Sequence, residues 1–207
     1  MTIEGDARRF IPEVVLECIQ NKVSLQLLVT GEAGVDMDGV ICSGYFDSEA
    51  PELVLEVGGD IDIWFPVMLH EYCHMRQWIE RKEWFEGADA DSELTEWLSG
   101  KVELSPEEID RYVRVTMELE GECEGRVIEL IKKWGMSIDV QEYGQKAMSY
   151  VHMYRLIGQL RQWSIPGKAP YKVEEVWRLF PSTIDLDWKP GEEHIQAYMK
   201  HCFAEKI

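Results

Sequence analysis

The chain has 207 residues, of which 45% are hydrophobic and eight are tryptophan, a composition typical of a globular protein. Its formal net charge is −18, from 39 acidic and 21 basic residues, which argues against direct binding to nucleic-acid phosphates because such binding requires a basic surface. No hydrophobic run approaches the length of a membrane span, and the N-terminus lacks a basic segment followed by an apolar one, so neither a membrane protein nor a signal peptide is expected. Five scattered cysteines favour reduced thiols and a cytoplasmic location.

The first part of the chain predicts one helix followed by short strands. The helix is expected over residues 8–22, and a loop rich in glycine and aspartate over residues 31–39. β-branched and aliphatic runs predict strands at Leu25–Thr30, Val40–Phe46 and Leu53–Val57. Because strands come early and helices later, the expected fold class is α+β, with a small sheet packed beside helices and a mostly helical C-terminal half.

A helix expected to have Pro66 in its first turn carries the sequence His-Glu-Tyr-Cys-His at residues 70–74, the H-E-x-x-H pattern. At about 100° per residue, His70 and His74 project from the same side of a helix and can bind one metal ion. Glu71 is the expected general base for a metal-bound water. The alternative is a pair of core histidines, each hydrogen-bonded to a backbone carbonyl, with Glu71 solvated.

A longer helix is predicted from Pro106 to Trp134, ended by Gly135. It starts with a serine, a first-turn proline and a glutamate at the third position, which together form a capping box. Two glycines inside it, Gly121 and Gly125, cost helix stability relative to alanine. We expect them to allow close approach to the motif helix.

Four alternate glutamates lie in this helix, at residues 118, 120, 122 and 124. Glu120 projects within about 40° of the centre of the apolar stripe, Glu124 lies at its border, and the other two point toward water. A carboxylate directed into a core is costly unless it is paired, protonated or bound to a metal. Glu120 is therefore the expected third metal ligand, since a catalytic zinc site has three protein ligands plus water.

The pattern His70-Glu71-x-x-His74, followed by Glu-x-Glu-Cys-Glu at residues 120–124, resembles the gluzincin branch of zinc metallopeptidases. The corresponding helix of ImmA/IrrE-type proteases reads Glu-x-Glu-Ala-Asn. The chain also resembles uncharacterised H-E-x-x-H proteins of tailed bacteriophages, which share a stretch like Cys42–Phe46. The resemblance covers about residues 40–160 and implies a zincin-like fold, in a protein that is phage-encoded and acts in the host cytoplasm.

The resemblance also implies a mechanism. Zinc held by His70, His74 and Glu120 would lower the pKa of a bound water and polarise the substrate carbonyl. Glu71 would take the proton of that water and pass it to the leaving amine. Glu124, one turn beyond Glu120, would orient a histidine ring from outside the ligand set.

An oxyanion donor is sought on a helix predicted over residues 142–163. Tyr150 and Tyr154 are one turn apart there, and either phenol, or His152 between them, could serve. The alternative for these aromatic side chains is packing in the core.

The expected domains are a metallopeptidase domain at residues 1–165 and a C-terminal extension at 166–207 that packs on it. The extension contains three prolines and a short helix near Glu192–Phe203. We expect its histidines, His194 and His201, to be surface residues. Cys73, inside the motif, is expected to be a small buried residue.

Together these features predict a zinc-dependent peptidase acting on a peptide or protein, and the acidic charge permits a basic partner. The alternative is an acidic interaction or inhibitor protein, such as a nucleic-acid mimic, with a structural zinc closed by four ligands. A degenerate peptidase that binds a peptide without cleaving it is a third possibility. Neither the oligomeric state nor the substrate is indicated by the sequence.

Overall fold

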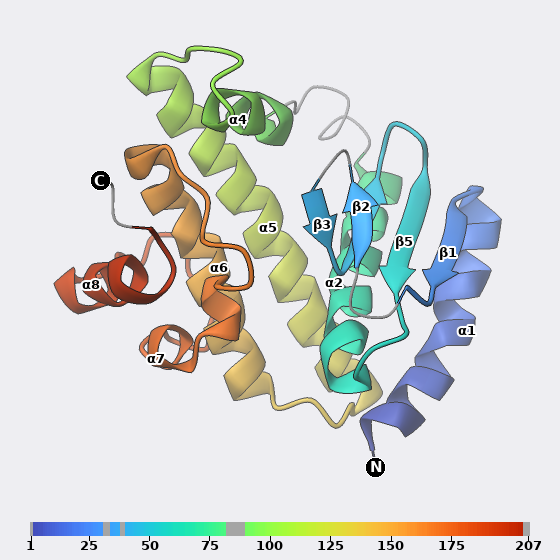
Figure 1. Cartoon of the computed structure of the whole chain (residues 1–207). Coiled ribbons are helices and arrows are strands. Elements are labelled where there is room, and N and C mark those ends of the chain that lie inside the picture. Colours follow the sequence, from blue (N-terminus) through green and yellow to red (C-terminus); the bar gives the residue numbers. More distant parts are fainter. Residues whose placement is uncertain (1, 31–33, 38–39, 82–89, 205–207) are drawn as a thin grey trace. The chain divides into compact units, whose positions relative to one another are not determined.

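The computed structural model describes residues 2–30, 34–37, 40–81 and 90–204. The fold is α+β, as predicted, with long helices and a small mixed sheet (Figure 1). The chain divides into two compact units. Unit 1 comprises Met1–Glu86 and Glu129–Ile138, and unit 2 comprises Gly87–Ile128 and Asp139–Ile207.

Unit 1 contains the described strands. They are β1 (Ser24–Leu28), β2 (Val35–Met37), β3 (Val40–Cys42), β4 (Gly44–Asp47) and β5 (Glu52–Glu56). The larger sheet has the order β1-β5-β4, in which β1 is parallel and β4 antiparallel to β5. Leu53 of the central strand β5 is paired in register with Leu25 of β1 on one side and with Phe46 of β4 on the other. β2 and β3 form a separate antiparallel pair.

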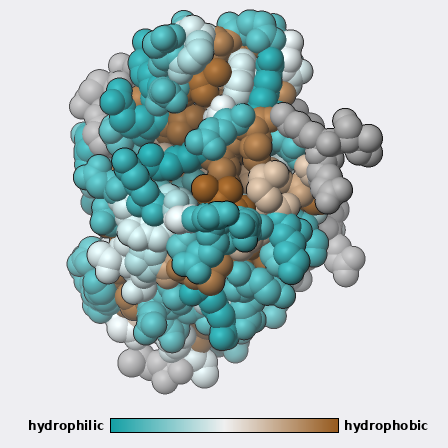
Figure 2. Space-filling view, turned by 90° about the vertical axis from the view of Figure 1, so that its left-hand side faces the viewer, coloured by the Kyte–Doolittle hydropathy of each residue, from teal (hydrophilic) through white to brown (hydrophobic). Residues whose placement is uncertain are grey.

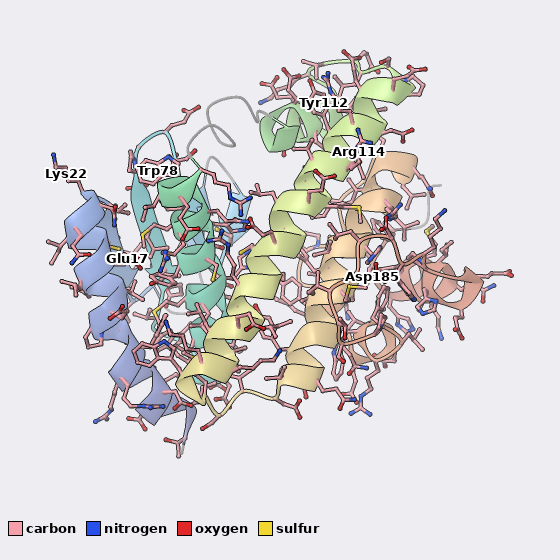
Figure 3. All side chains as sticks on the ribbon, turned by 180° about the vertical axis from the view of Figure 1, so that it is seen from behind. Glu17, Lys22, Trp78, Tyr112, Arg114 and Asp185 are labelled. Carbon is pink, nitrogen blue, oxygen red and sulfur yellow. The ribbon has the colours of Figure 1, made fainter. Side chains whose placement is uncertain are left out.

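Two helices of unit 1, α1 (Ile3–Asn21) and α2 (Ile61–Glu80), pack against each other and on this sheet, as the front and back views both show (Figures 1 and 3). Their contact is built around Phe10, whose ring meets Phe65, Tyr72 and Trp134 edge to face at centroid distances of 6.4, 5.2 and 5.2 Å. Phe10 is fully buried, so removing its side chain would cost about 3–5 kcal/mol.

Polar contacts hold α1 in place at two points. Near its start the buried Asp6 carboxylate accepts hydrogen bonds from Ser137 N at 2.5 Å and Arg9 at 2.6 Å. Burial raises the pKa of Asp6, but these hydrogen bonds outweigh that effect and hold the pKa below its usual value. Farther along, Glu17, labelled in Figure 3, accepts from the Tyr72 hydroxyl and pairs with Arg76 of α2 at 3.2 Å.

Unit 1 departs from the predicted elements at its caps and at one strand break. The first helix starts five residues early because the Thr2 side chain caps it by accepting from Gly5 N at 3.2 Å. The single strand expected over Val40–Phe46 is interrupted at Ser43, since β3 pairs with β2 whereas β4 pairs with β5. The prediction of Pro66 in the first turn is wrong: Asp60 caps α2, and Pro66 lies inside it.

The regular elements described in unit 2 are all helical. Its elements are α4 (Ala90–Leu98), most of α5 (Pro106–Trp134), α6 (Val140–Leu160), the 3-10 turn η2 (Pro170–Lys172), α7 (Glu174–Trp177) and α8 (Glu192–His201). The bounds of α5 match the prediction, and Gly135 ends it with a φ of +58°, a conformation that favours glycine. The last turns of α5, from residue 129, belong to unit 1.

The core of unit 2 lies between α6 and the C-terminal helices α7 and α8. Val151, Ile157, Val176 and Tyr198 are fully buried in one cluster. The surface seen in Figure 2 is mostly hydrophilic with smaller hydrophobic areas. Within the described residues, no helix combines the length and the apolar character needed to cross a membrane.

Candidate metal site

Helix α2 carries the H-E-x-x-H motif in its second half. Its first turn is fixed by Asp60, whose carboxylate accepts from Asp62 N at 3.0 Å. The helix packs on β4 and β5, so the motif residues lie close to the sheet. Cys73 is buried as predicted, and none of the five cysteines, all of which are described, forms a disulfide.

His70 and His74 point their outer ring nitrogens at each other. The two Nε2 atoms are 3.0 Å apart and the ring centroids 4.5 Å. Nitrogens at this separation can both lie about 2.0–2.1 Å from one point, the usual zinc–imidazole distance. The alternative of two histidines bonded to backbone carbonyls does not describe His74, whose ring nitrogens face His70 and a glutamine side chain.

That glutamine is Gln77, which is not among the site residues predicted from the sequence. It is fully buried, and its Oε1 accepts from His74 Nδ1 at 2.9 Å. With the proton on Nδ1, His74 presents an unprotonated Nε2, the form in which imidazole binds a metal. A sequence signal existed: Gln77 is an uncharged polar residue three positions after His74, hence on the same helix face.

Glu71 is anchored by the sheet. Its Oε2 accepts from the backbone N–H of Phe46 in β4 at 3.0 Å. Glu56 N donates to Ser43 O at 3.0 Å. Because backbone groups alternate in direction along an antiparallel strand, those of Ser43, Tyr45 and Asp47 face β5, whereas the N–H of Phe46 points away from it. The outward N–H of an edge strand thus holds the half-buried carboxylate that is predicted to be the general base.

The glutamates of α5 differ in their surroundings. Glu118 is exposed, as predicted, and Glu122 forms an ion pair with Arg126 at 3.0 Å. Glu120 is half-buried, whereas Glu124 is buried and accepts a hydrogen bond from the Tyr143 hydroxyl at 2.6 Å. These residues belong to unit 2. The third-ligand role of Glu120 and the orienting role of Glu124 stay predictions.

The two α5 glycines, Gly121 and Gly125, have different surroundings. A Cβ on Gly121 would meet the Leu186 side chain at 2.7 Å, so this glycine makes room for the C-terminal segment of its own unit. A Cβ on Gly125 would meet no described atom within 4 Å.

The proposed oxyanion donors on α6 form a hydrogen-bonded pair. The hydroxyls of Tyr150 and Tyr154 are 2.9 Å apart, with ring centroids at 5.6 Å. Tyr150 also contacts Tyr171, and Tyr154 contacts Trp163. The pair therefore belongs to an aromatic cluster of unit 2, the alternative given for it, and its catalytic role stays a prediction.

Two histidines of unit 2 have structural partners. His152 is fully buried, and its Nε2 donates to the carbonyl of Asp185 at 3.0 Å. Burial is the main cause that lowers its pKa. The expectation that His194 is a surface residue is wrong: it is buried against Phe180 and Trp188, and its Nε2 donates to Leu179 O at 3.1 Å. His201 is half-buried.

Comparison of the chain with protein-family models, with curated proteins and with solved structures gave no match.

Proposed function

We propose that the chain is a zinc-dependent hydrolase of the gluzincin type, and that its substrate is a peptide or protein. The observation that carries the proposal is the His70–His74 pair, with Nε2 atoms 3.0 Å apart and one ring held by Gln77. Imidazole pairs suit zinc, copper, iron and nickel. The adjacent Glu71 favours zinc hydrolysis among these, because H-E-x-x-H joins two ligands to a general base.

The chain's own residues divide the work in this proposal. His70 and His74 bind the metal, which when bound would lower the pKa of a water molecule and polarise a carbonyl. Glu71 is held through Oε2 by the Phe46 amide, and we assign its Oε1 to receiving the proton of water and delivering it to the leaving amine. A carboxylate fixed by a backbone donor needs no rearrangement before the proton moves.

We assign the third ligand to α5, with Glu120 as the first choice. Its half-buried carboxylate contrasts with the exposed Glu118 two residues earlier. Cys123, also on α5 and buried, is the other candidate because thiolates are zinc ligands. Tyr150 and Tyr154 remain the proposed donors to the oxyanion.

The deciding experiment is metal content by mass spectrometry, on protein loaded with zinc and then dialysed. Wild type, His74→Ala, Glu120→Ala and Cys123→Ser are compared, with Glu118→Ala as the matched control on the same helix. The expected result is one zinc per chain in the wild type and the control, lost in His74→Ala and Glu120→Ala. Loss with Cys123→Ser instead would transfer the third ligand to the thiol. A wild type that retains no metal would overturn the proposal.

The charge of −18 favours a second candidate, an acidic interaction or inhibitor protein. Such a protein attracts a basic partner through its overall field and needs no metal, or only a structural zinc closed by four protein ligands. If the variants that lose zinc also lose hydrolytic activity, this second candidate is excluded. A wild type that retains no metal would favour the interaction protein.

A further inference from the structure

Strand β1 forms one edge of the sheet in unit 1. Among the described residues it pairs only with β5. Ser24 N donates to Pro51 O at 2.9 Å, and Val57 N donates to Leu28 O at 2.8 Å. In a parallel ladder this register directs the backbone groups of Ser24 and Leu28 to β5, and those of the alternate residues Leu25 and Leu27 to the opposite side.

This edge lacks the protection that edge strands usually carry. Residues 23–30 read Val-Ser-Leu-Gln-Leu-Leu-Val-Thr, without a charge or a proline, in a chain that is 29% charged. Charged side chains, prolines and bulges normally keep such an edge from pairing with another strand. Here the register with β5 is continuous, and Leu27 and Val29 are 42% and 78% exposed.

The neighbouring helix adds apolar surface beside the strand. Helix α1 packs against β1, and its residues Leu16 and Ile19 are 51% and 70% exposed. They are three positions apart and thus share one side of the helix. Exposed apolar residues on two adjoining elements indicate an interaction surface.

We propose that this edge binds a second copy of the chain, with β1 pairing antiparallel to β1 of the partner about a two-fold axis. Such an interface is self-complementary. A two-fold axis at Leu27 places Leu27 opposite Leu27 of the second copy, and Leu25 opposite its Val29. The residues whose backbone groups face the other copy are therefore all aliphatic. Because α1 lies on one face of the sheet, the joined sheet carries both α1 helices on the same face.

Charge favours a second copy over a basic protein as the occupant. A basic partner is attracted to carboxylates, and the strand itself offers none. Two chains of charge −18 repel each other. They approach most easily at an uncharged segment such as residues 23–30, because no like charges face each other there. Salt screens that repulsion, so the dimer should become tighter as ionic strength rises, whereas binding of a basic partner should weaken.

The test is sedimentation velocity of the full chain at tens of micromolar, in low and in high salt. The wild type should be a dimer whose dissociation constant decreases with salt. Leu27→Lys places two lysines face to face at the axis and should weaken the dimer about tenfold or more. Ile195→Lys, at a similarly exposed position on α8 (40%), is the matched control and should remain dimeric.

A second variant tests strand pairing itself. Leu27→Pro keeps an apolar side chain and removes an outward N–H, leaving the ladder to β5 intact; it should also weaken the dimer about tenfold or more. A monomeric wild type at both salt concentrations would overturn the proposal, as would a Leu27→Pro protein that dimerises normally. None of these outcomes depends on metal content, so this inference and the proposed hydrolase function can fail separately.

Discussion

At the residue scale, Gln77 is a side chain outside the H-E-x-x-H motif that orients His74, one of the proposed metal ligands. It is fully buried and fixes the tautomer of His74 through a 2.9 Å hydrogen bond. We expect Gln77→Leu to weaken metal binding about 10–100-fold, because groups that orient ligands have effects of this size. Competition with a chromogenic chelator would measure the change. Gln77→Glu, which keeps an oxygen acceptor, is the control; equal affinities in Gln77→Leu and wild type would contradict the assignment.

Glu71 provides the second prediction at this scale. Replacement by glutamine keeps an oxygen that can accept from Phe46 N but removes the proton acceptor. We expect Glu71→Gln to bind zinc like the wild type. Its rate of hydrolysis, measured on a peptide library, should fall about 10²–10⁴-fold. Loss of the metal together with activity would show that Glu71 acts in binding rather than in proton transfer.

At the element scale, two helical glycines form a natural pair for a packing experiment. A Cβ on Gly144 of α6 would lie 1.9 Å from the Ser182 carbonyl oxygen, whereas one on Gly125 of α5 would meet no described atom within 4 Å. Gly144→Ala should therefore destabilise the fold by about 1–3 kcal/mol or more, and Gly125→Ala should stabilise it by about 0.5–1 kcal/mol. Urea unfolding measures both; equal effects would contradict this contact between α6 and the C-terminal segment.

The elements also show why some predictions succeed. Helix α5 was predicted to the residue because its serine–proline start and Gly135 are local signals. Helix α4 was missed, although Gly100, with a φ of +76°, follows its last residue by two positions. The strand predicted over Val40–Phe46 was divided because its two parts bond to different partners, and pairing is decided by residues distant in sequence.

At the scale of the whole molecule, stability should depend on pH through a buried histidine. Burial, together with the charge of Arg155, holds the pKa of His152 below its usual value, and the Asp185 carbonyl opposes this only in part. Since the unfolded value is about 6.5, the unfolded chain binds more protons below that pH, and the free energy of unfolding falls as pH decreases through about 6.5.

His152→Phe should remove this component. Urea unfolding at about pH 7.5 and pH 5.5 is expected to show a smaller decrease in stability for the variant than for the wild type. Identical decreases would show that other groups, such as the carboxylates of this acidic chain, cause the pH dependence.

The sequence by itself determined the α+β class, the helix that carries the H-E-x-x-H pattern and the glutamate helix, because helical spacing and caps act over a few residues. Only the tertiary structure decided how those parts are used. Glu71 meets an amide 25 positions away in sequence, His194 is buried against Trp188 and Phe180, and β1 is left at an edge of the sheet. Each depends on which segments pack together, and that choice is made by the burial of whole faces rather than by local propensity.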